Sequence, residues 1–329
     1  MKMSDLAKIA GVSKSTVSRA LAGSDLINIK TQEYIRELAK KHGYRKDMRA
    51  SNFRMKQMLT IGVLLPSDGT DSWLAENPFI LEMLGAISDS LELKGHELLL
   101  AKHSNSDPSW IKHFIENRSV DGIIVLGQSI YHDIINEASA NCRNLIVWGA
   151  HLPDQNYVAV GSDNYLGGQL VAEQLTKRNK TKLAFLGDIR CPEPNLRYQG
   201  FKDYLVNAGL PEPILINSEE SRNSVTSNFA KFLAGSNNID GLFTANDLLA
   251  LSAIQIAQDA GIKVPEDMAV IGYDNISLLK YINPSITSVS QNRKLAGSML
   301  VDKLLALIND EVAENEFIPT ELVIRDSCR

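Results

Sequence analysis

The stretch Met3–Leu21, MSDLAKIAGVSKSTVSRAL, decides how the N-terminal end of this chain folds. Ser4 is a residue type that caps helices, and Gly11 readily adopts the left-handed conformation in which helices end. Between them, apolar side chains recur at helical spacing, at Leu6, Ile9 and Ala10. The pattern predicts a first short helix, capped by Ser4, that ends at Gly11.

A second short helix is predicted to follow at once, with Ser13 as its N-cap. Its buried side is formed by Val17, Ala20 and Leu21. Its outward side is small, polar and basic, and consists of Lys14, Ser15, Thr16, Ser18 and Arg19. Two helices of this kind make a helix-turn-helix, in which the second helix enters the major groove of DNA. The alternative is an ordinary helical hairpin whose polar side is only solvated.

The sequence of residues 5–21 is more specific than a helix pair, because it resembles the N-terminal signature of the lactose-repressor/galactose-repressor (LacI/GalR) family of transcriptional regulators. The matching positions are Ala10, Gly11, Val12, Ser13, Thr16, Val17, Ser18 and Arg19. The resemblance implies DNA contacts on the second helix and at the start of a third, namely Lys14, Ser15, Thr16, Ser18, Arg19 and Thr31. The residues 14–16 would face the bases.

Positive charge is concentrated at the same end of the chain. The 329 residues together carry a net charge of −5, yet residues 1–58 contain 13 Lys and Arg against 5 Asp and Glu, a net charge of +8. A basic segment joined to an acidic remainder suits a polyanion such as DNA. The alternative is a charge that is merely solvated, but here the charge coincides with a DNA-reading motif.

Length and composition indicate a soluble globular protein of more than one domain. No stretch has the pattern of a signal peptide or a membrane span, so we expect a cytoplasmic protein. The cysteines Cys142, Cys191 and Cys328 are scattered and odd in number, which excludes a fully paired disulfide framework. We expect them to be reduced, and we expect neither a metal ion nor a cofactor.

A third helix, capped by Asn28 and ending at Gly43, would complete a DNA-binding domain over residues 1–45. Residues 46–58 are basic and thinly apolar, and we interpret them as a hinge or linker. In the family that this chain resembles, a hinge helix forms on DNA and an apolar side chain wedges into the minor groove. The resemblance places Phe53 at that position.

The hinge resemblance is partial. Ala50 matches the family, whereas Phe53 replaces its usual leucine, and Lys46 and Ser51 replace its usual proline and arginine. Phenylalanine is a competent wedge. The alternative is that Phe53 packs on the domain that follows.

From residue 59 onward, short apolar runs alternate with amphipathic segments, as in a doubly wound parallel α/β fold. The predicted strands are apolar at their centres: LTIGVLLP (59–66), HELLLAKH (96–103), VDGIIVLG (120–127), RNLIVWGA (143–150), KLAFLGD (182–188), IDGLFTAND (239–247) and MAVIGYDN (268–275). The predicted helices between them cover 80–94, 108–117, 165–177, 198–207 and 248–260.

The runs VDGII (120–124) and IDGLF (239–243) look like the same element in two successive lobes. Within a ligand-binding and dimerisation domain over 59–329, we expect lobe 1 to contain about 59–160 and 291–329, and lobe 2 about 161–290. Thr320–Arg325 is expected to be a strand of the first lobe. Bilobed domains close around a small molecule by hinging, and the resemblance implies an effector domain like a periplasmic sugar-binding protein.

Ligands of such sheets bind beyond the carboxyl ends of the strands. Polar groups for sugar hydroxyls and aromatic rings for sugar CH faces occur there at Trp73, Asn77, Phe79, Gln128, Trp148, Arg197, Asn246 and Asp274. The resemblance implies effector contacts at Arg197, Asn246 and Asp274. Other polar residues nearby have alternatives to ligand binding: Asp247 as a helix cap, Asp163 as a hinge turn, and Arg190 and His151 as solvated side chains.

Two other classes of protein share this architecture. An enzyme is not expected, because the chain has no G-x-G-x-x-G after a strand, no P-loop, no G-x-S-x-G and no H-E-x-x-H. A transport-type sugar-binding protein would carry a signal peptide and no DNA-reading head, which is the reverse of this sequence.

We therefore expect a homodimeric, allosteric repressor of sugar-utilisation genes that reads a near-palindromic operator. The two tryptophans Trp73 and Trp148, with the long segment 67–76, favour a glucoside or disaccharide as the inducer. The alternative is a corepressor-dependent regulator with a purine or sugar-phosphate effector, because a purine also stacks on tryptophan and bonds to Asn and Asp.

Overall fold

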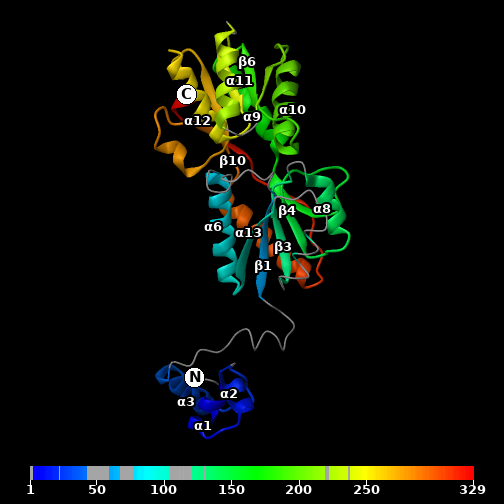
Figure 1. The fold of residues 1–329 in the computed structure, drawn as a ribbon, viewed down its shortest axis with the longest axis vertical. Coiled ribbons are helices and arrows are strands. Elements are labelled where there is room, and N and C mark those ends of the chain that lie inside the picture. Colours follow the sequence, from blue (N-terminus) through cyan, green and yellow to red (C-terminus); the bar gives the residue numbers. More distant parts are fainter. Residues whose placement is uncertain are drawn as a thin grey trace. The chain divides into compact units, whose positions relative to one another are not determined.

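The computed structural model describes residues 3–21, 23–42, 59–66, 77–103, 111, 114, 120–128, 131–218, 222–235 and 238–329. Contacts within the chain divide it into two compact units, residues 1–58 and residues 59–329 (Figure 1). No helix in these ranges is both long enough and apolar enough to cross a membrane.

The first unit is a bundle of three helices, α1 Met3–Ala10, α2 Lys14–Leu21 and α3 Ile29–Lys41. Its core consists of Leu6, Ala7, Val17, Ala20, Ile35 and Ala39. Two predicted caps are confirmed: Ser13 Oγ accepts the Thr16 N–H at 3.1 Å, and Asn28 Oδ1 accepts the Lys30 N–H at 2.9 Å. Gly11 has a φ of +66°, the left-handed conformation predicted for it.

Two details of the first helix were predicted wrongly. Ser4 lies inside α1, which begins at Met3, and its hydroxyl contacts the neighbouring Asp5 carboxylate instead of a backbone N–H group. Ile9 is 45% exposed, and Ala7 takes its place in the core. The helix is only two turns long, so a rotation of a few tens of degrees exchanges one apolar neighbour for another.

The second unit contains two sheets, each with six strands among the described residues. The first sheet has the order β11-β5-β4-β3-β1-β2 and is entirely parallel. Its strands are β1 Thr60–Pro66, β2 Glu97–His103, β3 Gly122–Leu126, β4 Leu145–Trp148, β5 Val158–Ser162 and β11 Glu316–Ile318. The four predicted strands of this lobe are confirmed.

The second sheet has the order β12-β10-β9-β8-β6-β7. Its strands are β6 Leu183–Gly187, β7 Ile214–Asn217, β8 Gly241–Thr244, β9 Ala269–Asp274, β10 Thr287–Ser290 and β12 Glu321–Val323. All pairs are parallel except β10 with β12. The three strands predicted for this lobe are therefore confirmed, and the doubly wound α/β class is correct.

The chain passes between the sheets three times. It leaves the first sheet after β5, returns after β10, and leaves again between β11 and β12. The prediction that Thr320–Arg325 forms a strand of the first lobe is therefore wrong, because Glu321–Val323 pairs with β10 of the second sheet. A strand of three residues with a charged first position carries no pattern that tells one sheet from the other.

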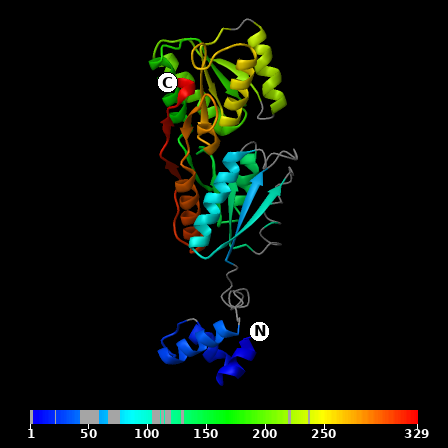
Figure 2. The ribbon, with the colours of Figure 1, turned by 90° about the vertical axis from the view of Figure 1, so that its left-hand side faces the viewer.

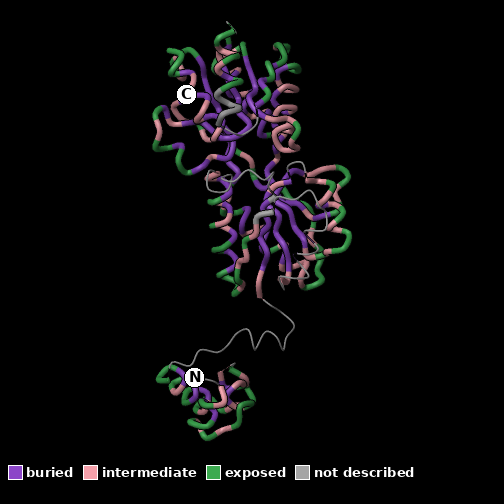
Figure 3. Tube along the Cα trace, in the orientation of Figure 1, coloured by how far each residue is buried: buried purple, intermediate pink, exposed green. Residues whose placement is uncertain are grey.

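Side chains of the first sheet alternate between two faces. Ile61, Val63 and Leu65 of β1 join the core cluster that contains α6 (Pro78–Leu93) and α13 (Arg293–Ile308). Leu64 joins a second cluster with Ile135 of α8 (His132–Ser139). Figure 2 shows α6 and α13 side by side along the sheet, and Figure 3 shows the buried strands between helices whose outer sides are exposed.

The second sheet is covered by α9 (Asn164–Lys177), α10 (Pro192–Asn207), α11 (Arg222–Ala234) and α12 (Asp247–Asp259). The closest approach is between α9 and α10, where glycines replace side chains. A Cβ on Gly168 would overlap the Arg197 carbonyl oxygen, and a Cβ on Gly200 would overlap the Tyr165 carbonyl oxygen. This backbone contact fixes α10, which carries Arg197.

We expect Gly200→Ala to lower the free energy of unfolding by about 1–3 kcal/mol, because the added methyl group meets backbone atoms that cannot rotate away. Urea denaturation of the purified chain measures it. Gly85 is the matched control: it is also helical but has nothing within 4 Å of an added Cβ. Gly85→Ala should be neutral or stabilising by up to about 1 kcal/mol, and equal losses in both variants would contradict the packing argument.

Candidate functional site

The outward side of α2 presents the residues predicted to contact DNA. Lys14, Ser15 and Arg19 are exposed, Thr16 and Ser18 are half-buried, and Val17 and Ala20 between them are buried. The Ser13 hydroxyl lies 2.7 Å from Ser15 Oγ and 2.8 Å from Thr16 Oγ1. The N-terminus of α2 therefore carries a group of hydroxyls beside a lysine, which can donate to and accept from base edges and phosphates.

The start of α3 is held by a buried glutamine. Gln32 Nε2 donates to the carbonyl oxygens of Ser24 at 3.1 Å and Ile27 at 2.9 Å, and its Oε1 accepts from Arg36 Nη2 at 3.3 Å. These bonds tie the connection between α2 and α3 to α3 itself. Thr31, half-buried in the first turn of α3, is placed by the same bonds. Ala50, Phe53 and Trp73 lie outside the described residues.

In the second unit, the carboxyl ends of the two sheets meet where the chain crosses between them. Ser162, the last residue of β5, lies with its hydroxyl 3.0 Å from Tyr273 Oη of β9 and donates to Gln291 Oε1 at 2.7 Å. Figure 1 shows that β1 runs toward the second lobe, and we call the region where the two lobes meet the lobe junction. The fold rule for α/β sheets places ligands at such an edge.

Arg197 lies buried at the lobe junction. Its Nε donates to Asn164 Oδ1 at 2.8 Å, its Nη1 donates to the Ala245 carbonyl oxygen, and its guanidinium lies 3.6 Å from the centre of the Tyr273 ring. These three partners are neutral, and a cation over an aromatic face is stabilised by the ring's negative potential. The guanidinium is therefore held by two neutral oxygen acceptors and an aromatic face.

Asp274 lies at the end of β9, on the same network. Its Oδ1 accepts from Gln291 Nε2 at 2.6 Å. Asp274 has a φ of +111° and Asn275 a φ of +54°, so two successive non-glycine residues occupy the left-handed half of conformational space. Such backbone is costly and persists where surrounding contacts hold it. Arg197 and Asp274 are thus brought together through Ser162, Tyr273 and Gln291.

Asn246 and its neighbour have separate roles. Asn246 Oδ1 caps α12 by accepting the Leu249 N–H at 2.9 Å. Asp247 is buried: its Oδ2 accepts the Ile276 N–H at 2.8 Å and its Oδ1 accepts from Ser288 Oγ at 2.6 Å. The alternative that Asp247 caps α12 is therefore wrong. Burial, and then the nearby Asp274 carboxylate, raise the pKa of Asp247 well above its usual value.

In lobe 1, the predicted residues occupy mainly structural positions at the strand ends. Asn77 Oδ1 caps α6 by accepting the Ile80 N–H at 3.3 Å. Phe79 and Trp148 are buried, with ring centroids 6.1 Å apart. Gln128 is fully buried: its Nε2 donates to the Ala150 carbonyl oxygen and to Tyr157 Oη, each at 2.7 Å. Both amide hydrogens of Gln128 are therefore engaged within the protein.

Asp163 and Arg190, two other polar residues near the strand ends, have local partners. Asp163 Oδ1 caps α9 by accepting the Leu166 N–H at 2.9 Å. Arg190 forms an ion pair with Asp188 at 2.6 Å. These side chains support the turns that follow β5 and β6.

Glu193, in the first turn of α10, is a residue at the lobe junction that the sequence analysis missed. Burial raises the pKa of its carboxyl above the usual value. The charge of Arg197 and the backbone N–H groups of Gln128 and Ala150 lower the pKa, but burial outweighs them. A side chain of lobe 2 thus faces backbone of lobe 1. The sequence contained a signal for Glu193, because it follows the carboxyl end of β6 just as Arg190 does. Ligands of parallel sheets bind beyond such strand ends.

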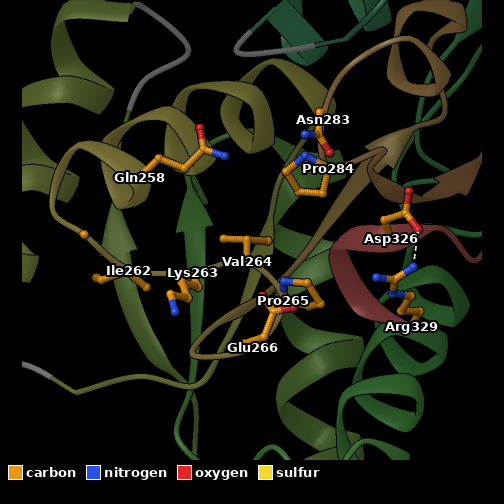
Figure 4. A pocket seen from close by; sticks show the side chains of 11 residues that line it. Gln258, Ile262, Lys263, Val264, Pro265, Glu266, Asn283, Pro284, Asp326 and Arg329 are labelled. Atoms are coloured by element: carbon orange, nitrogen blue, oxygen red, sulfur yellow. Dashed lines mark hydrogen bonds and ion pairs between the residues drawn. The ribbon is translucent and has the colours of Figure 1, made fainter.

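A cavity of about 660 Å³ lies elsewhere on the second lobe (Figure 4). It is lined by the segment Gly261–Glu266, by Asn283 and Pro284, and by Asp326 and Arg329, whose side chains form an ion pair at 2.9 Å. The segment Gly261–Glu266 precedes β9, so the cavity is at the amino end of that strand. Ligands of parallel sheets bind at the opposite end, and we assign no function to this cavity.

Residues 2–47 match the model of bacterial regulatory proteins of the lacI family, and residues 172–328 match a periplasmic binding protein-like domain. The chain is 28% identical to the HTH-type transcriptional regulator MalR of Clostridium butyricum, over 100% of this chain and 99% of that protein. It is 29% identical to the HTH-type transcriptional repressor PurR of Aliivibrio salmonicida, over 98% of this chain and 97% of that protein.

Among solved structures, the fold is similar to that of the lac repressor dimer bound to operator and the anti-inducer ONPF. The TM-score is 0.84 and the identity 24%, over 100% of this chain and 99% of that chain. The helix-turn-helix prediction and the bilobed α/β prediction agree with these similarities.

The raised pKa of Asp247 predicts a pH dependence of stability. A carboxyl whose pKa is higher in the folded state binds its proton more tightly there, so its contribution to stability falls as the pH rises above its ordinary value near 3.8. We expect Asp247→Asn to gain stability relative to the original protein as the pH rises from 4.5 to 7.5. The difference between their free energies of unfolding should increase by at most about 1.4 kcal/mol per pH unit. Urea denaturation followed by circular dichroism measures it.

The control is Asp259→Asn, which removes an exposed carboxylate from the other end of the same helix. Its stability should run parallel to that of the original protein over this range. Parallel curves for Asp247→Asn as well would contradict the prediction.

Proposed function

We propose, from the premise that this chain belongs to the lacI family of bacterial regulatory proteins, that it is a homodimeric repressor which a neutral sugar releases from a near-palindromic operator. As a member of that family it is a DNA-binding transcriptional regulator and not an enzyme. The observation that carries the proposal is the outward side of α2, where Lys14, Ser15 and Arg19 stand exposed around a capped helix N-terminus.

DNA reading by α2 is supported by the division of roles along the helix. Val17 and Ala20 bind it to the bundle, which leaves Lys14–Thr16 at the end that enters a major groove. The proposed organisation is a DNA-binding domain at 1–45, a hinge at 46–58 and an effector and dimerisation domain at 59–329. Ala50 and Phe53 are proposed as minor-groove contacts in the hinge. The similar lac repressor is a dimer on operator, and two-fold symmetry requires a near-palindromic site.

A neutral sugar as the effector is supported by the charges at the lobe junction. Asp274, Asn246 and Arg197 supply the forked polar groups that hydroxyls need, and Trp148 supplies an aromatic ring at a strand end. The Asp274 carboxylate disfavours a phosphate. Nε and Nη1 of Arg197 are already bonded to Asn164 and Ala245, so the guanidinium does not offer the two-pronged fork that a phosphate prefers. We propose a glucoside or disaccharide, with Trp73, Asn77 and Phe79 completing the site. Gln128, whose amide bonds to Ala150 and Tyr157, is proposed to hold the strand ends beside it.

The proposed release mechanism is allosteric. A sugar that binds at the lobe junction changes the angle between the lobes, and this moves the lobe 1 surfaces of the dimer and the hinge segments attached to them. A coupling free energy of about 1–3 kcal/mol changes operator affinity roughly 5- to 150-fold, which is enough to switch occupancy.

The DNA half of the proposal is tested by selecting an operator from a random DNA library with the full chain. We expect Lys14→Ala to weaken binding to the selected operator by about 1–3 kcal/mol, roughly 5- to 150-fold, because a base-facing contact is lost. Gel-shift titration measures it. Lys40→Ala removes an exposed lysine from the last turn of α3 and should stay within about threefold. Equal losses in the two variants would indicate charge attraction without reading by α2.

The effector half is tested by a thermal-shift screen against cellobiose, maltose, glucose 6-phosphate, guanine and hypoxanthine, because a bound ligand raises the melting temperature. We expect a disaccharide to stabilise the protein and to release the selected operator. Asp274→Asn should then bind that disaccharide at least about tenfold more weakly, since a charged hydrogen bond is worth about 1.5–3 kcal/mol, and should bind operator as before. A purine or phosphate that tightens operator binding would overturn the sugar and reverse the sign of regulation.

A further inference from the structure

We propose that Glu82 and Arg293 form a strap that ties the end of β9 in lobe 2 to α6 in lobe 1, and that this strap holds the lobe arrangement that binds operator. The inference rests on the proposed function, because it concerns the regulation of the same junction. It goes beyond that function by naming the contact through which the corner at Asp274 is connected to the rest of lobe 1.

The lobe 1 end of the strap is the Glu82 carboxylate on α6. Its Oε1 accepts the backbone N–H of Ser277 at 2.9 Å, and its Oε2 lies 2.6 Å from Arg293 Nε. Ser277 begins the short 3-10 helix Ser277–Lys280, three residues beyond the end of β9. One carboxylate therefore bonds simultaneously to a backbone group of lobe 2 and to the first residue of α13.

The second part of the strap is the guanidinium of Arg293, the first residue of α13, which packs beside α6 in lobe 1. Its Nη1 donates to the Asp274 carbonyl oxygen at 2.5 Å, and its Nη2 donates to the Asn275 carbonyl oxygen at 2.9 Å. Asp274 and Asn275 are the successive pair of positive-φ residues at the end of β9. With Nε on Glu82, all three nitrogens of the guanidinium are engaged, and its planar fork fixes the relative positions of its partners.

Further bonds hold the same corner from the lobe 2 side. The Asn275 N–H donates to Ser288 Oγ at 3.0 Å, and Arg325 Nη2 donates to Asn275 Oδ1 at 2.6 Å. The corner is thus rigid within lobe 2, and Arg293 and Glu82 connect it to lobe 1. A ligand that engages the Asp274 side chain acts on the residue whose backbone the strap holds.

A second ion pair joins the same two helices and provides a matched control. Lys94 Nζ, at the end of α6, lies 2.5 Å from Asp302 Oδ1 of α13. Both partners of this pair belong to lobe 1, and their side chains are 36% and 52% exposed. The side chains of Glu82 and Arg293 are 27% and 16% exposed. Because solvent screens exposed pairs, the strap is the stronger of the two contacts.

The test measures two properties of the full chain without any effector: affinity for the selected operator, and amide hydrogen exchange over residues 274–281. Glu82→Gln keeps the volume of the carboxylate and removes its charge, and Arg293→Lys keeps the charge and removes the fork. We expect each to weaken operator binding at least about fivefold, and to accelerate exchange at 274–281. The double variant should be little weaker than either single variant, because both break one contact. Asp302→Asn should stay within about twofold.

Operator affinity within twofold of the original protein in both strap variants would overturn the proposal, as would tighter binding or an equal loss in Asp302→Asn. Hydrogen exchange guards against a folding defect, since faster exchange confined to 274–281 distinguishes a broken strap from global destabilisation. A failure of the proposed function has a different signature: the original protein then selects no operator at all.

Discussion

The structure of the second unit depends on three chain crossings that are hydrogen-bonded to one another. The first follows Ser162, whose hydroxyl donates to Gln291 at the second crossing. The third crossing contains Thr320. Its Oγ1 accepts the backbone N–H of Asp163, which belongs to the first crossing, at 3.1 Å. Backbone that leaves a sheet loses its ladder partners and must find others. The crossings satisfy this need among themselves, and so the polar residues of the lobe junction gather at one place.

In the proposed function this junction serves two purposes. Arg197 and Asp274, which we propose as sugar contacts, are the same residues that hold the crossings in register through Tyr273 and Gln291. A ligand that competes for their hydrogen bonds therefore acts directly on the angle between the lobes. In this proposal, coupling between ligand binding and lobe position lies in these shared partners, without a separate transmission path.

The sequence predicts much of this fold, because its signals are local. A strand buried on both faces is recognised by its continuous apolar run. The N-caps of α2 and α3 are predicted from single residues, Ser13 and Asn28. The site is less accessible, because it depends on partners far apart in the chain. Gln128 is indistinguishable in sequence from a ligand-binding amide, yet Tyr157 and Ala150 occupy its hydrogens. Glu82 and Arg293 are separated by most of the chain, and only the fold shows that they touch.

The late position of β11 and β12 has a consequence for how the protein emerges from the ribosome. The three-helix head is complete by Lys41, so it can fold while most of the chain is still unmade. Each of the two sheets, by contrast, takes an edge strand from Glu316–Val323. Neither lobe can complete its sheet until residues 316–323 have been synthesised. The three-helix head is therefore complete long before either sheet of the second unit, and a nascent chain carries a folded head while both sheets still lack an edge strand.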